Sequence, residues 1–142
     1  MNAVLKPKLD AKAIEEAFPH VDAGLVPFGT RVLVQIRTAK AKSQGGILLH
    51  AETKETEKWN TQVARVVALG PVAFSNRDTL KVWPEGSWCK PGDFVRVPKY
   101  GGDRWEVAVP GREGEPALFA LYKDMDIIGA ITGDPLAVVA FI

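Results

Sequence analysis

The sequence predicts an all-β fold, a small antiparallel barrel in one domain, and three observations support this. With 142 residues, 46% of them hydrophobic and 25% charged, the chain has enough apolar material for one packed core and too little for two. After Leu25, short β-branched runs separated by Gly, Pro, Asn and Asp replace helical spacing. The turn signals also follow one another too closely for the crossover helices that a parallel sheet requires.

One short helix is expected before the strands. Asp10 is a suitable N-cap for a helix that runs from Ala11 to Phe18. Ile14 and Phe18 share one face of it, and Pro19 closes it. Because two apolar side chains offer little contact area, we expect this helix to be a small appendage of the barrel.

The strands are expected where apolar and β-branched residues lie between turn residues. The six predicted strands are Arg31–Ile36, Gln62–Leu69, Phe94–Val97, Arg104–Val109, Ala117–Tyr122 and Asp126–Ile131.

Two connections between these strands are too long for simple hairpins. The first, Thr38–Thr61, is rich in Lys and Glu, which cannot offset the entropy of ordering by burial, so we expect it to be mobile when alone. The second, Gly70–Gly92, contains Trp83 and Trp88, which predicts a projecting hairpin with a small aromatic cluster of its own.

Composition argues against several classes of function. Eighteen Lys and Arg against 17 Asp and Glu leave a formal net charge of +1, so the chain lacks the basic excess that attracts nucleic acid or an anionic membrane. The apolar stretch Ala137–Ile142 is far shorter than the roughly twenty residues that cross a bilayer. The first residues lack the apolar core of a signal peptide, so we expect a cytoplasmic protein.

Catalytic and metal-binding chemistry find no support in the sequence. Cys89, His20 and His50 are too few to complete a four-ligand zinc site, and no phosphate-binding glycine motif is present. Cys89 is expected to pack as a small hydrophobe. Asp124 and Asp126 resemble a carboxylate pair, but a solvated turn is the simpler interpretation. We therefore expect no catalytic residue, no metal and no cofactor, and the chain is not expected to be an enzyme.

Three aliphatic residues, Ile47 to Leu49, stand out inside the polar first connection, directly after Gly45 and Gly46. One interpretation is a hairpin that turns at the glycines and returns as a core strand. The other is an adhesive segment on a flexible tether, whose aliphatic side chains fill a groove on a partner. The residues alone leave both open.

Five motifs in a fixed order resemble the GroES family of co-chaperonins, the ring-forming lids of group I chaperonins. Arg31–Val34 is similar to the family's first barrel strand, and Lys42–Leu49 resembles its mobile loop with the G-G-I-V-L element. Val63–Gly70 resembles the G-x-V-x-A-V-G strand, and Lys90–Val95 the V-G-D-x-V turn and strand. Asp124–Ile131 resembles the terminal D-I-L-A-I segment.

The resemblance implies a GroES-like barrel at residues 25–131, with a mobile loop at 38–61 and a roof hairpin at 71–91. Residues 1–24, including the helix, and 132–142 are extensions. These extensions and the longer loops resemble a virus-encoded or otherwise specialised member. The implied chaperonin-binding residues are Gly45, Gly46, Ile47, Leu48 and Leu49. Tyr100 is implied to face the cavity.

The implied function is that of a homoheptameric ring that closes an ATP-bound GroEL-type chaperonin in the cytoplasm, or in the host cytoplasm if the protein is virus-encoded. A non-native client protein then folds in the enclosed cavity. The family pattern also implies that the terminal strand near Ile127–Ile131 pairs with the first strand, near Val26–Val34, of an adjacent subunit. On this view the N-terminal helix is dispensable for chaperonin binding.

Two other functions remain open. The chain could be an isolated β-barrel binding module, like the domain that zinc alcohol dehydrogenases share with this fold, although their Cys and His ligands are missing here. It could also bind single-stranded nucleic acid through Lys40, Lys42 and Lys54, with Trp59 as a stacking platform. Interleaved glutamates weaken the second alternative.

Overall fold

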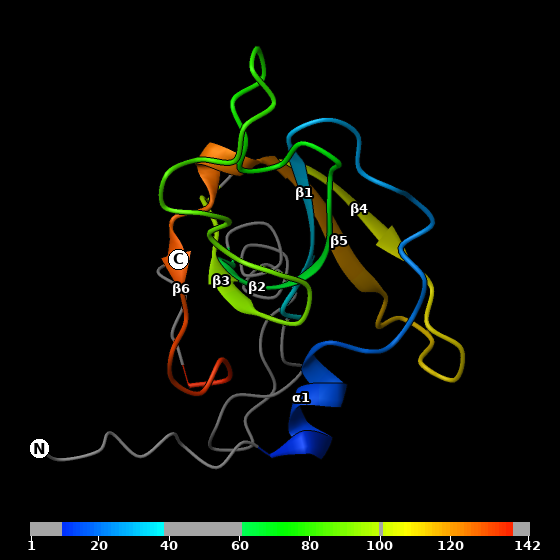
Figure 1. Cartoon of the computed structure of the whole chain (residues 1–142). Helices are drawn as coiled ribbons and strands as arrows, with labels where there is room; N and C mark the ends of the chain where they lie inside the picture. The colour runs from blue at the N-terminus through cyan, green and yellow to red at the C-terminus, as the bar shows by residue number, and fades with distance from the viewer. Residues whose placement is uncertain (1–9, 39–60, 100, 138–142) are drawn as a thin grey trace, which may run out of the picture.

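The protein is described from a computed structural model, in which residues 10–38, 61–99 and 101–137 are placed. One antiparallel sheet of six strands, in the order β4-β5-β1-β2-β3-β6, curves around an apolar interior (Figure 1). The strands are β1 (Arg31–Ile36), β2 (Val63–Leu69), β3 (Phe94–Arg96), β4 (Asp103–Val107), β5 (Ala117–Lys123) and β6 (Gly129–Ala130). The prediction of an all-β antiparallel fold is confirmed.

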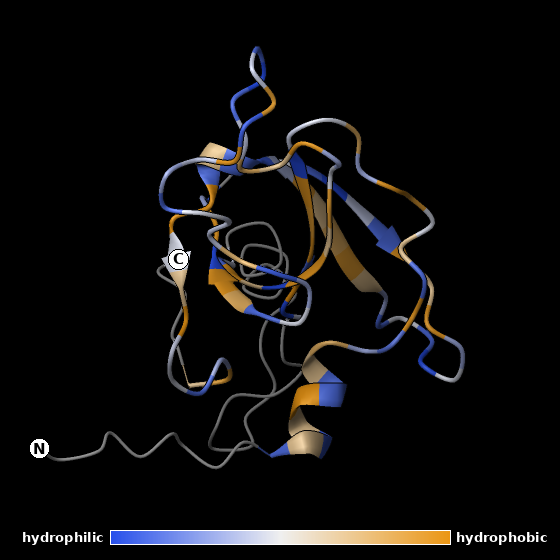
Figure 2. Cartoon of the chain, in the orientation of Figure 1, coloured by the Kyte–Doolittle hydropathy of each residue, from blue (hydrophilic) through white to orange (hydrophobic). Residues whose placement is uncertain are grey.

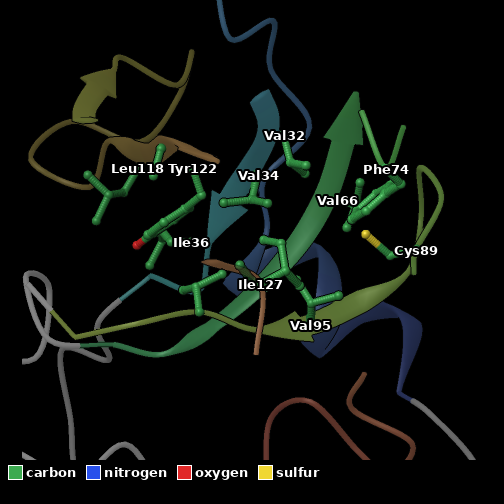
Figure 3. Close-up of a cluster of buried hydrophobic side chains, with 13 residues drawn as sticks. Val32, Val34, Ile36, Val66, Phe74, Cys89, Val95, Leu118, Tyr122 and Ile127 are labelled. Atoms are coloured by element: carbon green, nitrogen blue, oxygen red, sulfur yellow. The ribbon is translucent and has the colours of Figure 1, made fainter. Parts of the chain in front are cut away.

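The interior is built by alternation along the strands. Val32, Val34 and Ile36 of β1 point inward and are fully buried. Figure 3 shows them beside residues from β2, β3 and β5, with Phe74 and Cys89 at one end. The strands that enclose this core are mostly hydrophobic in Figure 2, whereas the hairpin that projects beyond them is mostly hydrophilic.

A second apolar cluster lies on the outer face of the same sheet. Leu33 of β1, Ala117 and Phe119 of β5, and Ala23 from the segment after the helix are all buried there. The indole of Trp105 stacks on Phe119, with ring centroids 6.1 Å apart, and its Nε1 donates a hydrogen bond to the Ala23 carbonyl oxygen at 3.0 Å. The sheet is therefore covered on its outer face by the chain's own N-terminal segment.

Helix α1 (Ala11–Ala17) begins as predicted. The Asp10 carboxylate accepts hydrogen bonds from the backbone N–H groups of Lys12 and Ala13, at 3.0 and 3.2 Å. The prediction of an appendage is wrong in one respect, since Phe18 at the C-cap is fully buried. Its ring lies 5.2 Å from that of Phe94 on β3. Among the described residues, no helix is long and apolar enough to cross a membrane.

The last predicted strand, Asp126–Ile131, is only partly correct. Residues Asp124–Asp126 form a 3₁₀ turn, η1, and β6 is limited to Gly129–Ala130. The buried Asp124 carboxylate accepts hydrogen bonds from the backbone N–H groups of Met125, at 2.8 Å, and of Phe74, at 2.9 Å. The chain has to leave β5 and turn back toward β3 within a few residues, and these bonds favour a tight turn over a continuous strand.

Candidate functional site

The first long connection leaves and re-enters the barrel at one place. Its last described residue on the outgoing side is Thr38, after β1, and its first on the returning side is Thr61, before β2. β1 and β2 pair antiparallel up to Ile36 and Ala64, and the Arg37 N–H donates to the Val63 carbonyl oxygen at 3.0 Å. The two ends are therefore held side by side, at the end of the barrel where α1 lies (Figure 1).

The side chains that the sequence predicted as a binding site belong to this connection. Gly45, Gly46, Ile47, Leu48 and Leu49 lie outside the described residues, and so does Tyr100. Lys40, Lys42, Lys54 and Trp59, the candidates for nucleic-acid binding, lie outside them as well. The structure describes the two ends of this connection, at Thr38 and Thr61, together with the elements that hold them. We call these parts the frame of the connection.

The Thr38 end of that frame is fastened to helix α1. The Thr38 N–H donates to the Ala17 carbonyl oxygen at 2.9 Å, and its hydroxyl donates to the Glu16 carbonyl oxygen at 3.4 Å. On the returning side, Thr61 is fully buried, and its carbonyl oxygen accepts a hydrogen bond from Arg104 Nη2 at 3.4 Å. Both ends are thus anchored before the chain enters residues 39–60.

Two hydrogen-bonded polar side chains, the buried Gln35 and the partly buried Arg65, lie beside this frame and are not among the predicted site residues. Gln35 is only 2% exposed, although its neighbours along the strand, Val34 and Ile36, are apolar. Its amide Nε2 donates to the Pro19 carbonyl oxygen at 2.7 Å, and its Oε1 accepts from Arg65 Nη2, also at 2.7 Å. A glutamine within a Val-Leu-Val-Gln-Ile run was the one available signal, because buried amides need partners.

The opposite end of the barrel carries the second long connection. The main chain turns between Asn76 and Lys81, where the Asn76 N–H donates to the Lys81 carbonyl oxygen at 2.7 Å. This hairpin projects from the barrel (Figure 1). Below it, the rings of Phe74, Trp83 and Trp88 contact one another with centroids 5.0 to 5.7 Å apart. The predicted hairpin with an aromatic cluster is confirmed.

One edge of the sheet is exposed, and exposed apolar side chains occur both next to that edge and, separately, before β1. In the described part of the chain, β6 pairs with β3 on one side and with no strand on the other. Ile128, next to β6, is 57% exposed, and Val26 and Phe28, before β1, are each 78% exposed. β1 itself has β2 and β5 on its two sides, so the part of the expected range Val26–Val34 that lies in β1 cannot pair with a neighbouring subunit.

Two other side chains considered from the sequence, Cys89 and Asp124, are both buried. Cys89 is buried in the interior, and burial together with the nearby Asp93 carboxylate raises its pKa from 9.0 to about 11, so the thiol stays protonated at neutral pH. This agrees with a packing role. Asp124 is buried and hydrogen-bonded rather than solvated, as described above, whereas Asp126 is exposed. Among residues 10–38, 61–99 and 101–137, no cluster of three or more potential metal ligands occurs.

Comparison with known proteins shows which family this chain belongs to. The model of the family described as "Chaperonin 10 Kd subunit" matches residues 24–131. The "10 kDa heat shock protein, mitochondrial" of Saccharomyces cerevisiae is 37% identical over 110 residues, which are 78% of this chain and 91% of that protein.

Two further relatives come from a plant and a bacterium. The "10 kDa chaperonin, mitochondrial" of Arabidopsis thaliana is 33% identical over 111 residues, 78% of this chain and 96% of the relative. The "Co-chaperonin GroES" of Lactobacillus acidophilus is 36% identical over 104 residues, 71% of this chain and 94% of the relative. With a match that spans the barrel and both long connections, the chain belongs to the 10 kDa chaperonin family, the GroES-type co-chaperonins.

Proposed function

We propose that this protein is a co-chaperonin that assembles into a ring, binds a GroEL-type chaperonin in its ATP-bound state and closes the cavity in which a non-native protein folds. The family match over residues 24–131 is the observation that carries this proposal, because it includes both the barrel and the two connections that a lid needs. The chain's own part is binding and enclosure, without catalysis or a cofactor.

The contact with the chaperonin is assigned to residues Gly45, Gly46, Ile47, Leu48 and Leu49. Burying each of the three aliphatic side chains contributes about 1.5 to 3 kcal/mol. Ordering the segment costs about 1 to 2 kcal/mol per residue, so one arm on its own binds weakly. A ring that presents several arms binds tightly by raising the effective concentration of each, and it releases when the nucleotide state of the partner changes.

The ring contact is assigned to the exposed sheet edge and the apolar segment before β1. The edge of β6 can add a strand from a neighbour, and Val26 and Phe28 offer apolar side chains that are otherwise exposed. The stretch Leu25–Phe28 takes the place of the wider range expected from the sequence, since β1 is already paired on both sides. A homoheptamer is the proposed assembly.

The remaining parts of the chain are assigned as the family resemblance implies. Residues 25–131 form the lid domain, residues 71–91 its roof, and residues 1–24 and 132–142 are N- and C-terminal extensions. Tyr100 is proposed to face the enclosed cavity. A cytoplasmic location, or the host cytoplasm for a virus-encoded protein, is part of the proposal and is tested by cell fractionation.

The proposal is tested by ATP-dependent co-sedimentation with a GroEL-type chaperonin, beside native mass spectrometry of the free protein. We expect a ring in the native mass and binding that requires ATP. Leu48→Asp is the matched control, because it should abolish binding while the ring mass and the melting temperature stay unchanged. A monomer that binds no chaperonin would instead favour the isolated β-barrel module.

A further inference from the structure

We propose that residues Asp10–Ala23 are a positioning element that fixes the direction in which the connection 38–61 leaves the barrel, and thereby strengthens binding to the chaperonin. This inference rests on the proposed function for its effect on binding. Its structural basis is independent of that function. It replaces the expectation that the N-terminal helix is dispensable.

The first step is the contact between helix α1 and the end of β1. The Thr38 N–H and hydroxyl both donate to carbonyl oxygens at the C-terminal end of α1, at 2.9 and 3.4 Å. Carbonyl groups in the last turn of a helix lack partners within the helix, so a strand end can satisfy them. The helix therefore holds the last described residue before the connection.

The helix is held against the barrel by the residues that directly follow it. The residues just after α1 are fastened through their main chain, since the carbonyl oxygens of Phe18 and Pro19 accept hydrogen bonds from Arg65 and Gln35, at 3.3 and 2.7 Å. The Arg65 guanidinium also lies 5.5 Å from the centre of the Phe18 ring. Burial lowers the pKa of Arg65, while Glu15 acts in the opposite direction. Removing either partner would leave a buried polar group unsatisfied.

Two further arginines, Arg112 and Arg37, make hydrogen bonds at the same end of the barrel. Arg112, in the β4–β5 connection, donates from Nη1 to the Glu16 carbonyl oxygen at 2.9 Å. Arg37 is buried, and its Nη1 donates to the Pro135 carbonyl oxygen at 2.9 Å. Both segments that flank the family match, residues 10–23 and 132–137, thus meet the barrel at the strand end from which the connection departs.

The consequence for binding follows from multivalency. If Thr38, at the start of the connection, is held in one direction, binding of the connection costs less conformational entropy. If Thr38 is free to move, that cost is larger. In a ring the same gain applies to each arm, so a change of a few-fold for one arm becomes a much larger change for the assembly. A loosened helix should weaken capture even though the apolar residues of the arm are unchanged.

The test compares Glu16→Pro with Glu16→Ala in the full-length ring. Both variants remove the same exposed side chain, but only proline breaks the helix, because it lacks an N–H group and its ring collides with the preceding turn. We expect Glu16→Pro to speed hydrogen exchange of the Thr38 amide about tenfold and to weaken ATP-dependent chaperonin binding more than tenfold. Glu16→Ala should match the wild type in both measurements.

Three outcomes decide the inference. Unchanged exchange at Thr38 in Glu16→Pro would overturn it, and so would faster exchange with wild-type affinity. Faster exchange with weaker binding by an intact ring would support it, since a merely structural role would not change the affinity of a ring that still forms.

A second pair of variants covers the case in which Glu16→Pro fails to assemble. Arg112→Ala removes only the bond to the helix end, and Arg77→Ala, within the hairpin turn between Asn76 and Lys81, is its control. We expect a several-fold loss of affinity for Arg112→Ala and none for Arg77→Ala, and equal affinities would contradict the inference. If the wild-type ring binds no chaperonin at all, the proposed function fails, while the exchange rate of Thr38 still reports whether the helix holds the strand end.

Discussion

The two ends of this barrel hold their irregular segments by different chemistry. At the end with the projecting hairpin, the proposed roof, the connection 71–91 is fastened by apolar side chains, with Phe74 fully buried and its ring in contact with those of Trp83 and Trp88. At the opposite end, which we call the base, the N-terminal segment is fastened not only by apolar contacts such as that of Phe18 with Phe94 but also by polar side chains that reach main-chain carbonyl oxygens, as Gln35 does with Pro19. Apolar packing supplies stability with little directional preference, whereas hydrogen bonds fix orientation at a smaller net gain.

This difference suits the two proposed tasks. A roof has to stay closed, and a cluster of aromatic rings achieves this within one stretch of chain. A binding arm has to leave the barrel in a defined direction, and hydrogen bonds from several elements define that direction. The following predictions, from the largest expected effect to the smallest, test whether the two ends differ as described.

Phe74→Ala should have the largest effect on stability. It empties the centre of the roof cluster, and replacing a buried Phe by Ala typically costs about 3 to 5 kcal/mol. Denaturant unfolding measures the change in the free energy of unfolding. Leu80→Ala, on the same hairpin but 63% exposed, is the control and should stay within about 0.5 kcal/mol of the wild type. Equal losses in the two variants would mean that the roof has no apolar core of its own.

Gln35→Leu should destabilise the base by about 1 to 3 kcal/mol, because it leaves the Pro19 carbonyl oxygen and part of the Arg65 guanidinium without a partner. A double-mutant cycle with Arg65→Met sharpens this prediction. The two side chains bond to each other, so the combined loss should be smaller than the sum, by about 0.5 to 3 kcal/mol. Additive losses would show that the two side chains act independently.

The pH dependence of Cys89 gives the smallest effect. Its pKa in the folded protein is about 11, above the ordinary value of 9.0, so its stabilising contribution is complete below pH 9 and is lost as the pH rises toward 11. Unfolding curves of the wild type and Cys89→Ala, recorded from pH 8 to about 10.5, isolate this contribution from other groups that titrate there. The wild type should lose stability relative to the variant across that window, and parallel curves would contradict the apolar setting of the thiol.

The sequence predicted the regular parts of the fold well, for identifiable reasons. The strand Arg31–Ile36 is predicted with its observed bounds, since its β-branched residues lie between turn residues and the run is too short for a helix. Asp10 was recognised as the N-cap because its carboxylate is a strong local signal. The roof cluster was expected from two tryptophans close together in the sequence.

What could not be predicted depends on contacts between distant parts of the chain. Phe18 and Pro19 bind the barrel through carbonyl oxygens, a group that every residue carries, so nothing in their side chains marks this role. A turn is predicted at Asp124, but its burial is not, because the partner of its carboxylate, the Phe74 N–H, is fifty residues away. The candidate binding residues Gly45–Leu49 and Tyr100 lie outside the described residues and remain predictions.

Assisted refolding tests the central claim most directly. A non-native client that a GroEL-type chaperonin and ATP capture but do not return to activity is incubated with and without the purified ring. We expect the wild-type ring to restore client activity in an ATP-dependent manner and Leu48→Asp to leave it at the level without the ring. A client yield that the wild-type ring does not raise would contradict the account.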